Sequence, residues 1–351
     1  MMKSFKRIGI WGLAVALCLA LFSGCGKEDP SSSSGDAGQG SSTPSVALNP
    51  FTGLPIEEDS YLTQRPVAIM INNIKQAQPL VGISDADMLF EITVEGGITR
   101  MMAVSQDPTQ LGDVGSVRSA RPYFVHIAKS LDALYIHVGG SEEAKSLLSN
   151  YDGNMEFING GYDGIWWRDS WRRQNLGYEH SVLTNGGKIQ TFLEESSMRT
   201  ELASGSAYHQ LFSEESPVLQ GEAATSMHLK FSGYKSSDLT YQPEKKTYLF
   251  SQFGNDLVDS NESAVTFTNV LALHIDSWVT DSYGHLALDL VGSGDGYYMS
   301  NGKAIPIQWS RASEDAPFVY TTATGEELAM LPGNTYVGIV PSSDSISIAA
   351  Q

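Results

Sequence analysis

Six arginines in the first half of the sequence are the residues best suited to chemistry on an anion. A guanidinium group presents several donors in a fixed fork, which matches the oxygens of a carboxylate or a phosphate. The chain is otherwise strongly acidic, with 22 Lys and Arg residues against 40 Asp and Glu residues. Converging arginines therefore indicate either an anion-binding site or a set of structural ion pairs. The six are Arg100, Arg118, Arg121, Arg168, Arg172 and Arg173.

Glycine-rich turns accompany these arginines. A Gly-Gly pair comes just before Arg100, and a Gly-Gly-Ser sequence at 139–141 follows the first three arginines. Glycine lets backbone amides approach a ligand closely, so the turns and the arginines together predict a polar cleft that binds an anion. The predicted binding residues are Arg100, Arg118, Arg121, Arg168, Arg172, Gly96, Gly97 and Ser141.

The same arginines also suit a purely structural role. Arg100 and Arg118 could pair with acids such as Asp87, Glu91 or Glu95 and hold loops together without any ligand. A third hypothesis is a structural module whose parts only space a larger complex. A flat surface without an arginine-lined cleft would favour that hypothesis.

Two carboxylates and a histidine could perform acid–base chemistry. Glu91 and Glu95 lie four residues apart, and hydrolysis of a glycosidic bond needs two carboxyl groups at a controlled separation. His180, in an expected loop, titrates near neutral pH. The candidate catalytic residues are therefore Glu95 and His180, in an alternative function as a hydrolase or transferase acting on cell-wall polymers with Arg100 and Arg118. Acidic residues near arginines are also typical of structural salt bridges.

The sequence predicts neither a metal ion nor a cofactor. The seven histidines are scattered singly, and neither an HExxH nor a CxxC motif occurs. There is no GxSxG motif for a nucleophilic serine, and Ser141 is better explained as a helix cap. His137, within an apolar run, is predicted to be a hydrogen-bonded core residue.

Aromatic residues gather near the last arginines. They could stack on sugar rings if they are exposed, and the alternative is packing in the core or at a domain interface. The group comprises Tyr162, Trp166, Trp167 and Trp171.

The elements that must position these residues follow from hydrophobic periodicity. Strands and helices alternate along the first half, which favours a mixed α/β layer. We expect strands at 66–71, 99–106 and 133–138, and helices at 122–131 and 142–148.

The second half has a different pattern of apolar segments and turns. A polar stretch at 204–225 separates it from the first half, and short apolar segments divided by turns follow. The predicted fold class is α+β, with an N-terminal mixed α/β domain at 49–204 and a smaller, mostly β C-terminal domain at 226–345. The Gly292–Gly296 segment is predicted to be a hairpin turn, because it opens onto no helix that could bind phosphate.

The N-terminus carries an export signal. Lys3, Lys6 and Arg7 precede an apolar run at 8–22, which is too short for a membrane span but fits a signal peptide at 1–24. The run ends in Phe22-Ser23-Gly24-Cys25, a lipobox of the kind that signal peptidase II cleaves before the cysteine. We therefore expect lipidation of Cys25 and a flexible Ser/Gly/Pro-rich tether at 25–48.

Lipidation constrains the location and the partners. A diacylglyceryl group with fatty acyl chains such as palmitate anchors a protein stably, so we expect an extracytoplasmic protein on the outer face of the cytoplasmic membrane. Cleavage before Cys25 removes three basic residues and no acidic one, which moves the formal charge from −18 to −21. Such charge disfavours nucleic acid as a partner. The expected partners are the lipid bilayer, through the anchor, and a cell-wall component or wall-synthesis protein.

Four ordered motifs carry a family resemblance. The body contains Asn-Pro-Phe-Thr-Gly at 49–53, Arg-Pro-Val-Ala-Ile-Met-Ile-Asn-Asn at 65–73, Val-Glu-Gly-Gly-Ile-Thr-Arg at 94–100 and Ser-Val-Arg-Ser-Ala-Arg at 116–121. Together they resemble the YerB-like lipoproteins of Gram-positive bacteria. The resemblance continues through Pro-Gly-Asn-Thr at 332–335, so that it covers nearly the whole body.

The resemblance implies two-domain exported lipoproteins of poorly defined biochemistry, and therefore a place in the cell envelope but no reaction. The family pattern after the arginines includes Pro-His-Asn, where this chain has Tyr178-Glu179-His180-Ser181. No role can therefore be carried over to His180. The leading hypothesis is an accessory or binding lipoprotein that recognises an anionic wall component or a wall-synthesis protein through an arginine-rich cleft.

Overall fold

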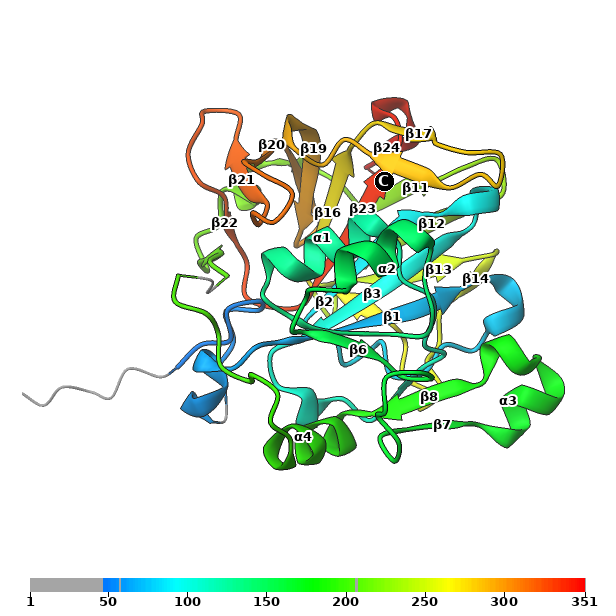
Figure 1. The fold of residues 1–351 in the computed structure, drawn as a ribbon. Coiled ribbons are helices and arrows are strands. Elements are labelled where there is room, and N and C mark those ends of the chain that lie inside the picture. The colour runs from blue at the N-terminus through cyan, green and yellow to red at the C-terminus, as the bar shows by residue number, and fades with distance from the viewer. Residues whose placement is uncertain (1–46, 57, 206–207, 351) are drawn as a thin grey trace, which may run out of the picture. The chain divides into compact units, whose positions relative to one another are not determined.

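Three buried strands form the centre of the N-terminal half (Figure 1). The computed structural model describes residues 47–56, 58–205 and 208–350, so the predicted signal peptide, Cys25 and most of the tether lie outside the described residues. Strand β1 (Val67–Asn73) pairs antiparallel with β3 (Thr99–Ser105), which pairs antiparallel with β2 (Met88–Thr93). Every residue of β1 and β3 is buried, because both faces of the sheet are covered.

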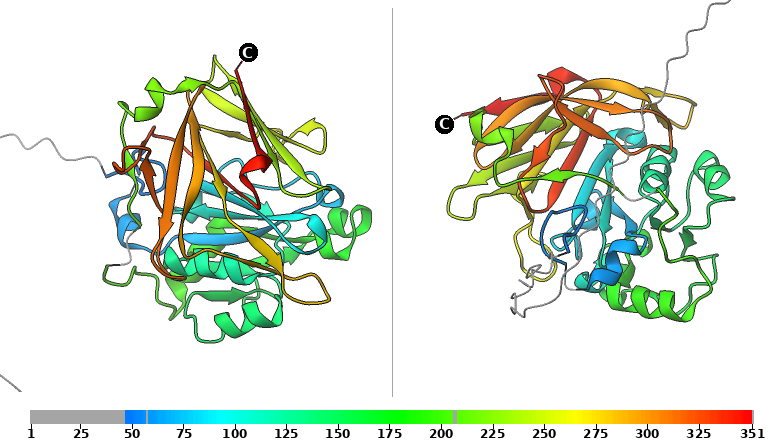
Figure 2. Two further views of the ribbon diagram at one scale, coloured as in Figure 1. Left: turned by 90° about the horizontal axis from the view of Figure 1, so that it is seen from above. Right: turned by 90° about the vertical axis from the view of Figure 1, so that its left-hand side faces the viewer.

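Helices cover one face of these strands. Helix α1 (Pro122–Ser130) leads into β5 (Leu134–His137), which pairs parallel with β1, and α2 (Glu142–Leu148) leads into β6 (Asn154–Glu156), which pairs parallel with β5. Side chains of β1 alternate between two core clusters, so that Ala68 and Met70 pack with α1 while Ile69 and Ile71 face the opposite side. The right-hand view of Figure 2 shows the helices on one side of the blue and cyan strands.

A smaller three-stranded sheet carries the later arginines. Strand β8 (Val182–Asn185) lies between β4 (Asp113–Gly115) and β7 (Trp166–Arg168). Helix α3 (Ser170–Asn175) follows β7, and helix α4 (Gly186–Glu195) follows β8. The short 3-10 helices of the described residues are η1 (Asp59–Thr63), η2 (Lys75–Ala77), η3 (Glu95–Gly97), η4 (Pro108–Gln110), η5 (Tyr178–His180), η6 (Pro217–Gln220) and η7 (Ser343–Ser345).

The two halves of the chain share one sheet. Strand β23 (Thr335–Val340) lies between β2 and β16 (Asn269–His274) and runs parallel to both. All six residues of β23 are buried, so it is a central strand of the shared sheet. Beyond β16, this sheet of the described residues continues through β19 (Gly292–Ser300) and β20 (Lys303–Arg311) to β10 (Glu222–Ala223), with β21 (Val319–Thr322) also paired to β20.

A second sheet packs on the other face of the central strands. It consists of β14 (Asn255–Asp256), β13 (Thr247–Gln252), β12 (Ser236–Gln242), β11 (Ser226–Lys230) and β24 (Ile346–Ala349), with β15 (Thr266–Phe267) also paired to β13. Buried and partly exposed residues alternate along β13, because only one face of this sheet meets the core. Two small pairs complete the described strands, β17 (Ser277–Val279) with β18 (Leu286–Leu288) and β9 (Leu211–Phe212) with β22 (Ala329–Met330).

The α+β class with a mostly β second half is confirmed. Within the part of the chain that the structure describes, no helix is long and apolar enough to cross a membrane. The predicted division at 204–226 stays a prediction, although β23 shows that strands from the two regions pair directly.

One prediction in the second half is wrong. The Gly292–Gly296 segment is the first part of strand β19 and pairs with β20, instead of forming a hairpin turn. A Cβ atom at Gly294 would lie 2.7 Å from Trp309 Nε1, so glycine permits the indole of Trp309 to cross this strand.

Candidate functional site

The turn between β2 and β3 holds a carboxylate between two arginines. Glu95 Oε2 accepts a hydrogen bond of 2.8 Å from Arg121 Nε, and Glu95 Oε1 is in contact with Arg121 Nη2 and lies 3.3 Å from Arg100 Nη2. Gly96 and Gly97 both have a φ of 72°, which lets this tight turn form without steric strain. We call Glu95, Arg100 and Arg121 the Glu95 cluster.

Backbone carbonyls complete the Glu95 cluster. Arg100 Nη1 donates to the carbonyl of Ser119 at 2.8 Å, and Arg121 Nη1 donates to the carbonyl of Ala120 at 2.7 Å. Burial, with the neighbouring Arg118 guanidinium, lowers the pKa of Arg100 to about 10, so this side chain remains charged at neutral pH. Burial also lowers the pKa of Arg121. These two predicted binding residues are thus already engaged within the protein.

Arg118 differs because its acidic partner faces solvent. Its Nη2 donates a 2.9 Å hydrogen bond to Glu179 Oε2, and the Glu179 side chain is 67% exposed. Its Nε has no hydrogen-bond partner among the residues that the structure describes. The backbone of Arg118 is hydrogen-bonded to Met70 and Val138, which ties its loop to the strands β1 and β5. The Nε atom is closed off from solvent, so what a rigid backbone presents at the surface is the outer part of the guanidinium group, paired with an exposed carboxylate.

His180 lies beside this guanidinium as a neutral acceptor. Asn72 Nδ2 donates to His180 Nδ1 at 2.8 Å, which leaves the other ring nitrogen to carry the proton. Burial lowers the pKa of His180, and the charge of Arg118 lowers it further. The His180 imidazole is therefore neutral at pH 7 and presents an N–H donor from Nε2.

Arg168 and Arg173 surround an exposed tyrosine. The Arg168 guanidinium lies 3.6 Å from the centroid of the Tyr178 ring, and that of Arg173 lies 5.5 Å away. Arg168 Nη1 also donates to the carbonyl of Tyr178 at 2.9 Å. Tyr178 immediately precedes Glu179 and His180 in η5. We call the group formed by Arg118, Arg168, Arg173, Tyr178, Glu179 and His180 the arginine surface.

Arg172 is fully used by the fold. It donates to three backbone carbonyls, those of Ala77, Pro79 and His180, at 2.6 to 2.8 Å. The residue is 4% exposed, and burial lowers its pKa. Arg172 thereby connects α3 to the loop after β1, and each of its guanidinium nitrogens already donates to a backbone carbonyl.

The remaining predicted residues support the site indirectly. Ser141 accepts a hydrogen bond from the backbone N–H of Ala144 and caps α2, as expected. The carbonyl of Gly97 accepts from Ser232 Oγ, which connects the Glu95 cluster to the β11–β12 connection. His137 is bonded through both ring nitrogens and is 1% exposed, which confirms a core role.

The two catalytic candidates belong to different sets of contacts. Glu95 is engaged by Arg100 and Arg121, whereas the His180 ring is engaged by Asn72. In the described part of the chain, no group of three or more His, Cys, Asp and Glu residues is placed to hold a metal ion.

The aromatic group is divided between packing and exposure. Trp166 stacks on Phe157 with ring centroids 6.5 Å apart, and Tyr162 packs edge-on against Phe192. Trp171, on α3, is 57% exposed, as is Tyr178. Trp167 is partly exposed, with Lys188 Nζ 5.0 Å from its ring centroid. Trp171 and Tyr178 are thus the most exposed of these aromatic residues.

Sequence reasoning missed a buried ionic centre at Glu91. Glu91 pairs with Lys235 Nζ at 2.8 Å, and both side chains have no exposed surface. Ser237 and Tyr336, from the second half of the chain, donate to Glu91 Oε2 at 2.8 and 2.6 Å. Burial lowers the pKa of Lys235, although Glu91 opposes the shift.

One residue of the Glu91 centre belongs to a recognisable sequence pattern. Ser232 and Lys235 have the S-x-x-K spacing of some nucleophilic serines. The structure separates their functional groups, since Ser232 Oγ donates to Gly97 and Lys235 Nζ binds Glu91. The S-x-x-K spacing therefore marks a structural contact between the two halves, and the serine that accepts a hydrogen bond from Lys235 Nζ is instead Ser237, which is fully buried.

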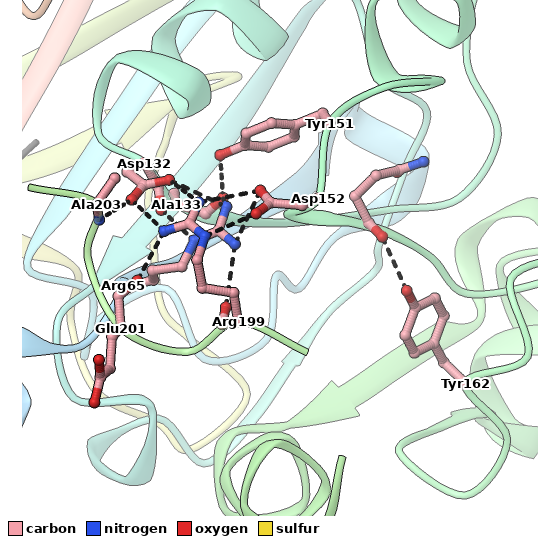
Figure 3. A network of polar contacts seen from close by, with 10 residues as sticks. Arg65, Asp132, Ala133, Tyr151, Asp152, Tyr162, Arg199, Glu201 and Ala203 are labelled. Carbon is pink, nitrogen blue, oxygen red and sulfur yellow. Dashed lines mark hydrogen bonds and ion pairs between the residues drawn. The ribbon is translucent and has the colours of Figure 1, made fainter. Parts of the chain in front are cut away.

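A second missed network joins the ends of the N-terminal half (Figure 3). Arg199 donates to both oxygens of Asp132 at 2.7 Å and to Asp152 at 2.7 and 3.1 Å. Arg65, with a fully buried side chain, lies 3.3 Å from Asp132. These four residues form a clasp between the start of β1 and the segment after α4, which places Arg65 and Arg199 in stability and not in binding.

Comparison with known proteins covers both halves of the chain. Residues 51–199 match the family described as protein of unknown function (DUF3048) N-terminal domain, and residues 227–337 match the DUF3048 C-terminal domain. The Bacillus subtilis (strain 168) protein named "Putative lipoprotein YerB" is 27% identical over 307 residues, which are 86% of this chain and 88% of that protein.

The fold agrees with this relationship. A crystal structure of YerB protein from Bacillus subtilis superposes with a TM-score of 0.75 at 27% sequence identity, covering 86% of this chain and 99% of that chain. The family resemblance expected from the motifs is confirmed. The chain belongs to the YerB-like family and carries the two DUF3048 domains in order.

Proposed function

We propose that this protein is a lipid-anchored binding protein of the cell envelope that recognises an anionic wall component through its arginine surface. The observation that carries the proposal is Arg118. Its guanidinium is held by a rigid loop and is partly exposed, and its acidic partner Glu179 is 67% exposed. An exposed ion pair contributes only about 0–1 kcal/mol, so a ligand can displace Glu179 at little cost.

The neighbouring groups suit a carboxylate or phosphate ligand. His180 is neutral at pH 7 and offers an N–H donor, and Arg168 and Arg173 add positive charge around Tyr178. Charged donors bind an anion more strongly than neutral ones, and the Tyr178 side chain, 57% exposed beside these guanidinium groups, can contact the apolar side of a sugar ring. Wall glycans that carry carboxylates or phosphates combine both kinds of surface.

The anchor rests on the N-terminal pattern and on the relative. The segment before Cys25 has the charge and apolar run of a signal peptide, and YerB carries the word lipoprotein in its name. We expect the natural chain to be found in the membrane fraction and to be labelled by a fatty-acid analogue. A Cys25→Ala variant should lose the label, and continued labelling would contradict the anchor at this residue.

Sedimentation with insoluble sacculi tests the arginine surface. The full chain, purified in detergent, is mixed with sacculi and with sacculi from which acid has removed the phosphate polymers. We expect salt-sensitive binding, reduced about tenfold or more in an Arg118→Gln/Arg168→Gln variant, because charge-assisted hydrogen bonds contribute about 1.5–3 kcal/mol each. Acid treatment distinguishes a phosphate ligand from a carboxylate ligand.

The matched control is Lys230→Gln, which removes an exposed positive charge on β11. It should bind like the natural chain. Undiminished binding by the double variant would contradict the proposed site. Binding to a purified wall-synthesis enzyme but not to sacculi, with the same dependence on Arg118, would contradict the wall component as the ligand.

The hydrolase alternative receives no support from the geometry. Both oxygens of Glu95 contact guanidinium groups, so this carboxylate is committed to holding Arg100 and Arg121. A binding role needs no such reactive group, and it is the function that the arrangement supports best.

A further inference from the structure

A groove of about 350 Å³ lies between the first turns of α1 and the β17–β18 hairpin. Pro122, Tyr123 and His126 line it on the helix side, and every residue from 286 to 291 lines it on the other side. Successive residues of a strand point to opposite faces, so a groove that all of them line runs along an edge of the strand. Since β17 occupies one edge of β18, the groove runs along the other edge.

The groove-side edge of β18 has no neighbouring strand. Within the described part of the chain, β18 pairs with β17 alone. In an antiparallel ladder, hydrogen-bonded pairs of residues alternate with pairs that are not hydrogen-bonded. At the two ends of this ladder, Thr280 N–H donates to His285 at 2.8 Å, and Asp289 N–H donates to Asp276 at 2.9 Å. The alternation therefore joins Ala287 to β17 and leaves its two neighbours in β18 without such bonds.

Those neighbours, Leu286 and Leu288, direct their backbone groups away from β17. The N–H and C=O of Leu286 and the N–H of Leu288 have no hydrogen-bond partner among the described residues, and the C=O of Leu288 accepts from Leu290 N–H at 3.0 Å. Both leucines are partly exposed and line the groove. Such an edge is a template on which another extended segment can form backbone hydrogen bonds.

Three carboxylates indicate which kind of segment fits the groove. Glu143, Asp289 and Glu314 all line it and are exposed. Within the residues that the structure describes, Glu143 and Asp289 form no ion pair, and the Glu314 carboxylate pairs only with His126, at 3.7 Å. Complementary charge orients a partner, so these acids favour a segment with Lys or Arg. A second copy of this acidic chain would bring further negative charge to the groove.

The two faces of the hairpin set the order of side chains in the segment. Leu286 and Leu288 are partly buried and pack against the core, so apolar residues suit the positions opposite them. Ala287 points to the other face, which it shares with Trp278, its partner in the ladder. Trp278 is 53% exposed, so a Lys or Arg side chain beside Ala287 can contact its ring. The expected order is apolar, basic, apolar.

We propose that the free edge of β18 binds an extended segment of a partner protein, with alternating apolar and basic side chains, as a third strand of the β17–β18 hairpin. The segment runs antiparallel to β18, and its residue opposite Leu286 donates to Leu286 C=O and accepts from Leu286 N–H. The residue two positions away accepts from Leu288 N–H, and the basic residue between them faces Trp278. This inference goes beyond the proposed function and does not depend on it, because it uses no residue of the arginine surface.

Fluorescence anisotropy of a labelled peptide, Lys-Val-Lys-Val-Lys with both ends capped, tests the proposal with the full chain in detergent. We expect saturable binding that weakens with salt, and no binding of Glu-Val-Glu-Val-Glu. N-methylation of the second valine removes the N–H that donates to Leu286 and should lower the affinity about tenfold. N-methylation of the central lysine, whose N–H points away from β18, is the matched control and should leave the affinity unchanged.

A pair of charge variants tests the protein side of the contact. Glu143→Gln/Asp289→Asn removes two of the three carboxylates and should lower the affinity about three- to tenfold. Glu142→Gln/Asp163→Asn makes the same change of charge at exposed positions that do not line the groove, and it should bind like the natural chain.

Four results would overturn the proposal. They are equal affinity for the two N-methylated peptides, equal affinity for the acidic and basic peptides, equal affinity of the two double variants, and absence of binding up to about 1 mM peptide. Dimers that form in sedimentation equilibrium and exclude the peptide would assign the edge to a second copy instead.

Discussion

Glu91 and Glu95 lie four residues apart, the first within β2 and the second in the turn after it, and each is paired with basic side chains, yet their surroundings differ. Glu91 has no exposed surface and is bound by Lys235 from the second half of the chain. Glu95 is 17% exposed and is bound by two arginines of its own half. The difference teaches that an ion pair can join distant segments where water is excluded, or hold a local turn where water still reaches it.

Removing the cation at Glu91 should have the largest effect on stability. In a Lys235→Met variant, Glu91 would remain buried without its charged partner, and losses of about 3–5 kcal/mol are typical of such changes. Urea unfolding followed by tryptophan fluorescence measures the loss. Lys230→Met, an exposed change on the neighbouring strand, should stay within about 0.5 kcal/mol. A loss below about 1 kcal/mol for Lys235→Met would erase the contrast with Glu95.

Neutralising Glu95 should destabilise the fold less than Lys235→Met does, and it should strengthen the binding of sacculi. Glu95→Gln weakens the hold on Arg100 and Arg121, and we expect a loss of about 1–3 kcal/mol in the free energy of unfolding. The freed guanidinium groups should also increase the binding of sacculi. Glu244→Gln, on an exposed turn, is the control and should alter neither quantity. Weaker binding by Glu95→Gln would show that its carboxylate serves the ligand instead of the fold.

The ion pairs of the clasp in Figure 3 should stabilise the fold to a degree that depends on pH. Burial raises the pKa of Asp132, but hydrogen bonds from Arg199 and the charge of Arg65 outweigh it, so the pKa falls below its ordinary value of 3.8. Hydrogen bonds from Arg199 also lower the pKa of Asp152. A carboxyl with a lowered pKa stabilises the fold above pH 3.8, and this contribution is lost as the pH falls through the folded-state pKa.

An Arg199→Gln variant measures this contribution. At pH 7 it should lose about 1–2 kcal/mol of unfolding free energy, because charge-assisted hydrogen bonds are removed. The difference from the natural chain should shrink as the pH falls below 3.8. A difference that stays constant between pH 7 and pH 3 would mean that the clasp acts through packing and not through charge.

Arg118→Gln should have the smallest effect on stability. Its partner Glu179 is 67% exposed, so the change should alter the free energy of unfolding by about 0.5 kcal/mol or less. Thermal unfolding of this variant beside Glu95→Gln checks the order of the two effects. A loss for Arg118→Gln that exceeds the loss for Glu95→Gln would place Arg118 in the fold and weaken the case for a ligand site.

Much of the first half could be predicted from local sequence. Strand β1 was expected at 66–71 and lies at Val67–Asn73, and helix α2 was expected and found at 142–148 with Ser141 as its cap. Local signals were sufficient because a cap or an apolar run acts within a few residues. The hairpin expected at Gly292–Gly296 failed, because the packing of Trp309 against Gly294 depends on the neighbouring strand β20.

The site was predicted only in outline. The sequence singled out Arg118 and Arg172 alike, but the structure binds Arg172 to three backbone carbonyls and leaves Arg118 beside an exposed glutamate. These partners lie 8 to 95 residues from Arg172 and 61 residues from Arg118 in the chain. Periodicity contains no information about such pairs, so the sequence alone could not separate structural arginines from available ones.

By itself, the sequence determined the family through its ordered motifs. It determined the α+β class, the acidic charge and the positions of β1, β3 and β5 through composition and short-range pattern. Only the tertiary structure decided that β23 lies between β2 and β16 and that Glu91 meets Lys235. It also decided which arginines remain available. The physical reason is that burial and ionic partnership are properties of contacts between distant segments, and a side chain's role depends on the water that those contacts exclude.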